Sequence, residues 1–381
     1  MRVDVKPDLL VWARERARIE AEGLSRRFPK LSEWESGDVQ PTLKQLENYA
    51  NATHTSLGFL LLPEPPTESI PIPDFRTISD QALSGVSADL LDTVYACQQR
   101  QDWYRDYARS NREDFVPFVG SVDIDASVVV AANAMREALE FGLNERSQAS
   151  TWSAALDLLR EHAEEAGVLV MVNGIVGSNS HRKLDPEEFR GFALSDPLAP
   201  VVFVNGSDTK AAQIFTLAHE LAHIWLGESA LSDADMVGQS ARPIERWCNE
   251  VAAEFLVPLD ALQAAIGDLS DLTVELDRLA RLFKVSTLVI LRRIHDAGNL
   301  SWREYRSAFT AERERVLGLM GERGSGGNFY NTTPVRVSKR FARAVIASTW
   351  EGQTMYRDAT RLLGFKKLAT LDELGHSLGV G

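Results

Sequence analysis

Residues 216–227 read TLAHELAHIWLG, and this stretch decides how the centre of the chain folds. It places His219, Glu220 and His223 in the pattern HExxH. Positions i and i+4 share one face of an α-helix, so both imidazoles can bind one zinc ion. Glu220 can then accept a proton from water whose pKa zinc lowers toward ~7. The alternative is a buried amphipathic helix whose histidines bond to backbone carbonyls.

The third ligand of such a site is expected in the next predicted helix, IERWCNEVAAEFLVP at residues 244–258. A catalytic zinc ion keeps three protein ligands and one open position. Glu245 follows His223 by 245 − 223 = 22 residues, and Asn249 lies one turn later, where it could support a ligand histidine. Periodicity leaves other candidates open, namely Glu250 and Glu254 as carboxylates and Cys248 as a softer ligand.

The composition is that of a folded soluble protein. The chain has 381 residues, and its formal net charge is 41 − 54 = −13, which argues against broad coating of nucleic acid. The hydrophobic share of 44% excludes a collagen, a disordered chain and a disulfide scaffold. The widely separated Cys97 and Cys248 indicate a reducing compartment. We find no signal peptide and no apolar run near the ~20 residues that cross a bilayer, so we expect a cytoplasmic protein without membrane contact.

We expect an α+β, mostly helical multidomain chain whose small zincin core combines a mixed sheet with the HExxH helix. Three strands are predicted within residues 167–176, 189–196 and 199–207 before this helix. VVFVN at 201–205 could pair with an extended substrate if it is the sheet edge, or it could be an interior strand. The predicted segments are a helical domain at 1–62, a proline-rich linker at 63–76, a helical region at 77–150, the zincin-like domain at 151–265, a helix-turn-helix-like domain at 266–318 and a helical tail at 319–381.

The runs FTLAHELAHIWLG and IERWCNEVAAEFLVP resemble the ImmA/IrrE family of metallo-endopeptidases. The resemblance implies a His, His, Glu metal site with His219, His223 and Glu245 as ligands, Glu220 as the catalytic base and Asn249 as a supporting residue. Asn249 stands where larger zincins often have Asp. The resemblance implies one Zn²⁺ ion, although the ligand set also permits manganese. It further implies a protein substrate, a transcriptional repressor or an antitoxin or toxin encoded nearby.

The group that stabilises the oxyanion is not identified by the sequence. His181, Arg182 and Tyr330 are candidates, and each has the alternative of an ordinary surface or loop residue.

The segment LSEWESGDVQPTLKQLENYANATHTSLGFLLLP at 31–63 resembles the second half of an XRE/Cro-type helix-turn-helix domain. The resemblance implies a DNA-binding domain at 1–62, in which Arg26, Arg27 and Lys30 could contact phosphates. Two features oppose DNA binding. Pro29 stands where the recognition helix should begin, and residues 1–60 carry nine basic and nine acidic side chains. The alternative is a dimerisation or substrate-docking module, which leaves a homodimer open.

Two further segments carry weaker signals. Residues 272–301 read as helix, turn, helix, with Arg292 and Arg293 able to face a phosphate backbone, or alternatively as a packing unit beside the peptidase. The tail at 323–381 has a net charge of 9 − 4 = +5 and resembles the tail of longer ImmA/IrrE proteins encoded beside a PIN-like toxin. The alternative there is a solvated basic face on a helical cap.

The sequence therefore predicts a zinc-dependent endopeptidase that cleaves or inactivates a regulatory protein in a stress, mobile-element or toxin–antitoxin system. The alternative function is a non-hydrolytic DNA-binding regulator or antitoxin whose zincin domain binds a partner.

Overall fold

The computed structural model describes residues 2–74, 86–232, 242–319, 334–365 and 367–380. The chain divides into two compact units, which are treated separately below. The first unit comprises Met1–Pro71 and Ile78–Tyr95, and the second comprises Ile72–Thr77 and Ala96–Gly381. The glycine-rich stretch RGSGGNFYN at 323–331 lies outside the described residues.

The first unit consists of short helices around an aromatic core. They are α1 (Pro7–Arg16), α2 (Ala21–Ser25), α3 (Leu31–Glu35), α4 (Leu43–Ala52) and the 3-10 helix η1 (Phe59–Leu61). The rings of Phe28, Trp34 and Tyr49 contact one another edge to face or tilted, and the Tyr49 hydroxyl donates to the Leu10 carbonyl at 2.7 Å. Trp34 is buried in this core.

The candidate DNA-contacting residues of this unit lie between α2 and α3. Arg26, Arg27 and Lys30 are all exposed there, and the Arg27 guanidinium lies over the Phe28 ring. The helix α3, which would serve as the recognition helix, is only five residues long. DNA binding by this unit therefore stays a prediction.

The second unit is built on a four-stranded mixed sheet. Its strands β1 (Leu169–Asn173), β2 (Gly191–Leu194), β3 (Val201–Asn205) and β4 (Ala230–Ser232) lie in the order β1-β3-β2-β4. β1 and β3 are parallel, and the other pairs are antiparallel. The α+β fold and the three predicted strands are confirmed. Of the two alternatives for 201–205, the interior strand is the one observed, because β1 and β2 bond to β3 on its two sides.

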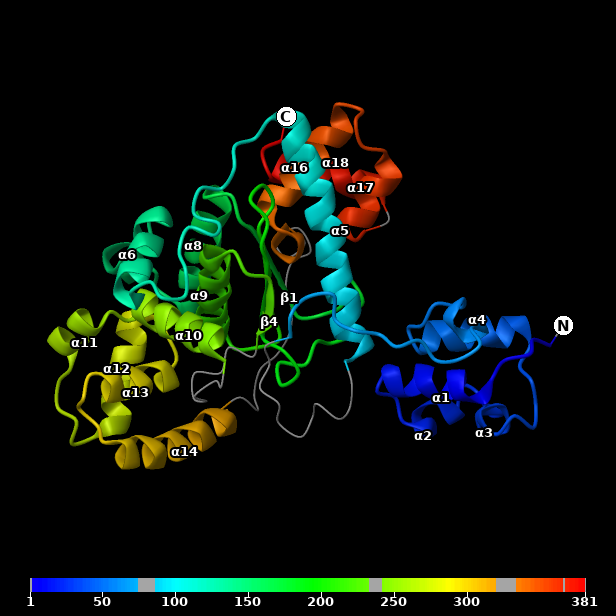
Figure 1. Ribbon diagram of the computed structural model, residues 1–381, viewed down its shortest axis with the longest axis horizontal. Helices are drawn as coiled ribbons and strands as arrows, with labels where there is room; N and C mark the ends of the chain where they lie inside the picture. Colours follow the sequence, from blue (N-terminus) through cyan, green and yellow to red (C-terminus); the bar gives the residue numbers. More distant parts are fainter. Residues whose placement is uncertain (1, 75–85, 233–241, 320–333, 366, 381) are drawn as a thin grey trace. The chain divides into compact units, whose positions relative to one another are not determined.

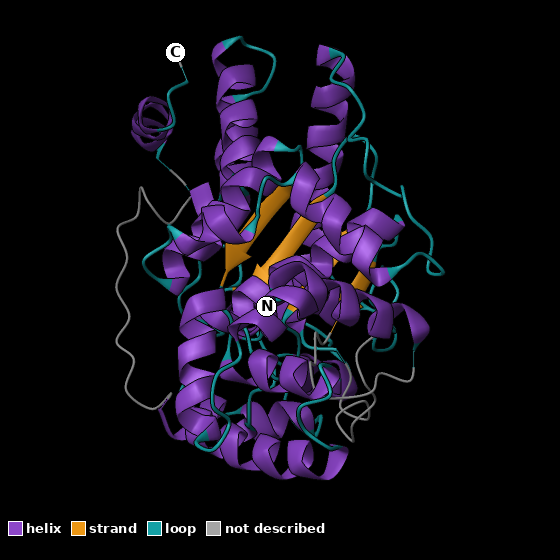
Figure 2. Cartoon of the chain, turned by 90° about the vertical axis from the view of Figure 1, so that its left-hand side faces the viewer, coloured by secondary structure: helices purple, strands orange, loops and turns teal. Residues whose placement is uncertain are grey.

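Helices cover both faces of the sheet, so its strands are buried throughout (Figures 1 and 2). α8 (Trp152–Glu165) and α9 (Lys210–Leu226) lie on one face, and α5 (Ala88–Asn111) and α16 (Lys339–Trp350) lie on the other. Alternate strand residues serve the two sides, as a pleated sheet requires. Val170 and Val202 join the core under α9, whereas the Met171 sulfur lies 3.7 Å from the Cys97 sulfur on α5.

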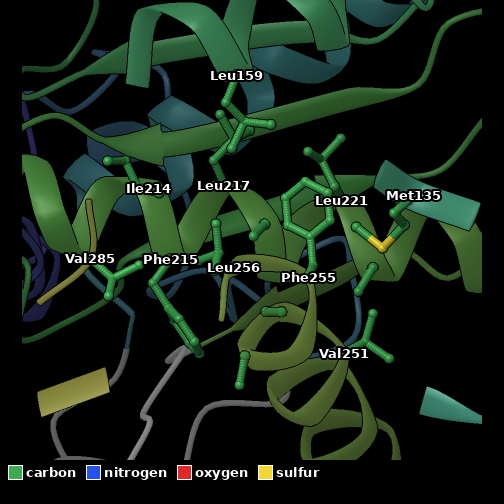
Figure 3. Close-up of a cluster of buried hydrophobic side chains, with 14 of the residues drawn as sticks. Met135, Leu159, Ile214, Phe215, Leu217, Leu221, Val251, Phe255, Leu256 and Val285 are labelled. Carbon is green, nitrogen blue, oxygen red and sulfur yellow. The ribbon is translucent and has the colours of Figure 1, made fainter. Parts of the chain in front are cut away.

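The helix α10 (Pro243–Leu256) packs against α9 and against α6 (Val128–Ala138). Figure 3 shows part of the resulting core, in which Leu221 of α9 lies beside Phe255 of α10 and Leu217 lies beside Leu159 of α8. The remaining helices are α7 (Leu143–Ser147), α11 (Leu259–Ala265), α12 (Leu272–Phe283), α13 (Thr287–Asp296), α14 (Trp302–Leu319), α17 (Tyr356–Leu363) and α18 (Leu368–Ser377).

The second helix-turn-helix-like segment corresponds to α12 and α13 and serves packing. Arg293 is buried, pairs with Glu254 on α10 and donates to the Val257 carbonyl at 2.9 Å. It is therefore unable to face a phosphate backbone, and that hypothesis is wrong for this residue. Arg292 bonds to Asp296 at 2.9 Å on its own helix.

The ends of α9 are set by local sequence. The Thr209 hydroxyl accepts the Ala212 N–H at 3.2 Å at the start of the helix. Gly227 ends it with a positive φ of 75°, which glycine adopts without steric cost. Trp225, in the last turn, stacks on Phe118 with ring centroids 3.9 Å apart. These contacts fix where the HExxH helix begins and ends against the sheet.

Among the described residues, no helix combines the length and the apolar character that a membrane span needs.

Gly191 allows α9 to approach β2 closely. A Cβ atom at this position would lie 2.6 Å from Thr216 Cγ2 and 2.8 Å from the Phe203 carbonyl oxygen, and backbone cannot yield as a flexible side chain can. We expect Gly191→Ala to lower the free energy of unfolding by about 1–3 kcal/mol, the usual cost of overpacking. Urea denaturation followed by circular dichroism measures the change.

Gly318→Ala is the matched control, because Gly318 lies in α14 with no atom within 4 Å of an added Cβ. It should leave stability unchanged or raise it by up to about 1 kcal/mol through helix propensity. Equal stabilities of the Gly191→Ala variant and the unsubstituted protein would contradict the close approach.

Candidate metal centre

Two histidines of α9 face each other across one helical turn. The Nε2 atoms of His219 and His223 lie 3.1 Å apart, and both side chains are fully buried. The HExxH motif spaces them four residues apart, which places them on one face of a helix with 3.6 residues per turn. Their ring centroids are 4.9 Å apart, so both rings direct a nitrogen to the same point.

Glu245, in the first turn of α10, completes the cluster. Its Oε2 lies 3.3 Å from His219 Nε2, and its Oε1 lies 3.1 Å from His223 Nε2. In the described part of the chain, these three are the His, Cys, Asp and Glu side chains whose ligand atoms gather within 4.8 Å of one another. Two imidazoles and a carboxylate are a donor set that zinc takes in catalytic sites.

Glu220 and Ser232 lie beside this cluster. Both are fully buried. The Ser232 hydroxyl on β4 lies 3.2 Å from His223 Nε2 and 3.5 Å from both Glu220 Oε2 and Glu245 Oε1. Among the described residues, Glu220 Oε1 and His219 Nδ1 are buried without a hydrogen-bond partner. A buried carboxylate oxygen without a partner can accept a hydrogen bond from a further donor such as water.

The electrostatics separate the two carboxylates. Burial, with the nearby Glu245 charge, raises the pKa of Glu220 well above its usual range. Burial alone would also raise the pKa of Glu245, but its contacts with the two histidines outweigh burial and lower the pKa to about 2. Burial lowers the pKa of His223. Neutral imidazole and ionised carboxylate are the forms that bind a metal cation.

In the part of the chain that the structure describes, no lysine or arginine side chain pairs with these buried carboxylates. The ion pairs of Glu245 are with the two histidines, and Glu220 forms none with lysine or arginine. A buried negative charge without a counter-ion is costly. A divalent cation among the three ligand side chains would supply the missing positive charge, so the residues fit a metal ion.

The rival ligands named from the sequence lie elsewhere. Glu250 is exposed, and Glu254 is buried in an ion pair with Arg293. Cys248 is buried, and burial raises the pKa of its thiol well above its usual value. Asn249 is half-buried one turn after Glu245, where it was expected.

The oxyanion candidates named from the sequence remain unassigned. His181 is exposed and Arg182 half-buried in the loop between β1 and β2, and Tyr330 lies outside the described residues. Sequence reasoning missed Ser232, because β4 is three residues long and a lone serine carries no periodic signal. A serine that follows the HExxH helix in an apolar setting is a weak signal, and only the sheet brings it to the cluster.

Comparison with known protein families points to the part of the chain that contains the metal cluster. Residues 163–295 match a peptidase family model described as an IrrE N-terminal-like domain. Residues 337–377 match a domain of unknown function. Neither the curated proteins nor the solved structures yielded a match. The match over 163–295 contains His219, His223 and Glu245, and it supports a metallopeptidase of the ImmA/IrrE type.

Proposed function

We propose that this protein is a zinc-dependent endopeptidase that cleaves a regulatory protein. The observation that carries the proposal is the buried convergence of His219, His223 and Glu245 beside a second acidic side chain, Glu220. A structural site closes all four positions of a tetrahedral zinc ion with protein ligands, whereas a catalytic site keeps three. Because the described residues supply three ligand side chains, we favour a catalytic zinc site over a structural one.

His219, His223 and Glu245 would hold the ion. Zinc bound there would act as a Lewis acid and lower the pKa of water toward ~7. Glu220 would serve as the general base, because its unpartnered Oε1 can accept a hydrogen bond from water. Its raised pKa suits this role, since the carboxylate then takes up a proton readily and can deliver it to a leaving amine.

The Ser232 hydroxyl supports the same arrangement. It can donate to either carboxylate from its position between Glu220 Oε2 and Glu245 Oε1. We assign it a positioning role, because it holds the base and the ligand carboxylate in a common orientation. Asn249 is proposed as a supporting residue for the site from its place one turn after Glu245.

The proposed substrate is a transcriptional repressor or an antitoxin encoded nearby, in the cytoplasm, within a stress, mobile-element or toxin–antitoxin system. This setting rests on the resemblance of the HExxH and α10 sequences to ImmA/IrrE proteins. The alternative is a non-hydrolytic regulator that only binds its partner, through the zincin domain or through DNA contacts of Arg26, Arg27 and Lys30. The base variant described below separates the two.

The metal site makes one prediction. Glu245→Gln and His223→Ala should each weaken zinc binding by more than ~100-fold, since losing even a hydrogen-bond partner of a ligand costs about 10–100-fold. Glu250→Gln, an exposed change on the same helix, is the control and should bind one zinc ion per chain like the unsubstituted protein. Competition with a chromogenic chelator measures the affinities. Unchanged affinity in Glu245→Gln would remove this residue from the ligand set.

The catalytic role makes a second prediction. Glu220→Gln should keep the fold and the bound zinc but lose about 10²–10⁴-fold in cleavage rate, the usual contribution of a general base. The assay incubates the full-length protein with the purified repressor or antitoxin encoded beside it and follows fragments by mass spectrometry. Glu250→Gln again serves as the control. If the Glu220→Gln variant forms no fragments but still relieves repression at full strength, the non-hydrolytic alternative is correct instead.

A further inference from the structure

The strand β4 lies at the edge of the sheet, next to the metal cluster. The strand order β1-β3-β2-β4 leaves β4 with a strand neighbour on one side, β2. Leu231 lies opposite Phe192 of β2, between the pairs formed by Ala230 and Ser232. Its N–H points away from β2 and donates to a residue outside the sheet. Backbone groups at a sheet edge bind extended peptides by strand addition.

A segment of the linker occupies this edge. The Leu231 N–H donates to the Pro73 carbonyl at 2.9 Å, and Asp74 forms a parallel bridge with Leu231. The Ile72 side chain is 8% exposed, so it is anchored rather than solvated. Arg242, the residue before α10, donates through Nη1 to the Asp74 carbonyl oxygen. Residues Ile72–Asp74 are called the edge segment below.

The edge segment lies close to the reaction centre. Ser232 is the residue after Leu231, and its hydroxyl is 3.2 Å from His223 Nε2. Neighbouring residues of a strand are about 3.3 Å apart along the chain direction. A polypeptide that pairs with Leu231 therefore passes within a residue or two of the cluster. Arg242 lies three residues before the ligand Glu245, so the same turn of chain positions the ligand and holds the edge segment.

We propose that the edge segment is an internal competitor that occupies the docking strand for substrate. This inference rests on the proposed function. An extended peptide must reach the cluster to be cleaved, and β4 is the sheet edge beside it. A protein substrate then displaces Ile72–Asp74 before it binds, which keeps the site closed to unrelated peptides.

The chemistry of the segment suits displacement. Proline has no N–H, so Pro71 and Pro73 remove two of the donors a strand would use in pairing. In the described residues, the segment holds β4 through the Leu231–Pro73 hydrogen bond and gains the side-chain bond from Arg242. Tethering to the same chain gives it a high effective concentration at the edge. A strand-forming substrate without prolines offers more backbone bonds and can replace it.

Arg242→Ala is the test variant, and Arg246→Ala is its matched control. Both arginines are exposed and belong to the same turn of chain, but the bond to Asp74 comes from Arg242. Full-length protein is compared by hydrogen exchange. We expect the Leu231 amide to exchange at least ~10-fold faster in Arg242→Ala, while Arg246→Ala matches the unsubstituted protein. The exchange rates of amides in the interior strand β3 should be equal in the unsubstituted protein and in the two variants, which shows that the fold is unchanged.

A second variant and a second measurement complete the test. Ile72→Asp removes the apolar anchor and should expose Leu231 in the same way. A labelled peptide with the sequence of residues 63–74, PEPPTESIPIPD, is the binding probe. We expect it to bind the Ile72→Asp variant, which keeps Arg242, at least ~5-fold more tightly than the unsubstituted protein, measured by fluorescence anisotropy, because the edge is then vacant.

Three outcomes decide the proposal. Unchanged Leu231 exchange in both variants would overturn the occupancy of the edge. Faster exchange without tighter peptide binding would overturn its role as a docking strand. Zinc content is measured in the same samples. Absence of zinc from every variant would count against the proposed peptidase function. The exchange and peptide-binding results would still decide the role of the edge segment.

Discussion

The burial of four polar side chains where α9 meets α10 is the constraint on which the rest of this structure depends. His219, Glu220 and His223 are fully buried on a helix that is apolar on its other faces, and Glu245 reaches them from α10. Buried charges and imidazoles are tolerated only when they face partners. The approach of the two helices must therefore be held accurately, and the apolar residues shown in Figure 3 do this around the polar cluster.

The far end of α10 is held by arginines from three other helices. Arg136 donates to the Glu254 carbonyl at 2.7 Å, Arg146 donates to the Leu256 carbonyl, and Arg293 donates to the Val257 carbonyl. The last carbonyls of a helix lack intrahelical donors and carry partial negative charge, so cations stabilise them. Arg146 is almost completely buried, and burial lowers its pKa to about 9. These contacts orient the helix that presents Glu245 at its opposite end.

The features predicted well are those with a local cause. The HExxH helix has its cap at Thr209 and its glycine stop at Gly227 because neighbouring residues alone create those ends. The strands at 169–173, 191–194 and 201–205 were predictable from continuous apolar runs, which a sheet covered on both faces requires. The zincin-like class followed from these elements together with the spacing of the two histidines.

The features that were missed or left open depend on packing. Strand order is a relation between distant segments, so periodicity could not show that β3 is interior and β4 is the edge. One helix, α10, carries all three candidate carboxylates, and its packing angle against α9 decides their surroundings. Glu245 faces the histidines, Glu250 lies in solvent and Glu254 pairs with Arg293. Ser232 reaches the cluster through three residues of strand pairing that no periodic pattern marks.

Residue type and spacing were thus sufficient for the helix with its two imidazoles, for its ends and for the acidic helix that follows, because each arises within a few turns of chain. The tertiary structure alone decided which carboxylate meets the imidazoles, that a serine joins them and that the linker lies along β4. Each of these depends on contacts between segments far apart in the sequence, whose geometry is set by how the helices and the sheet exclude water together.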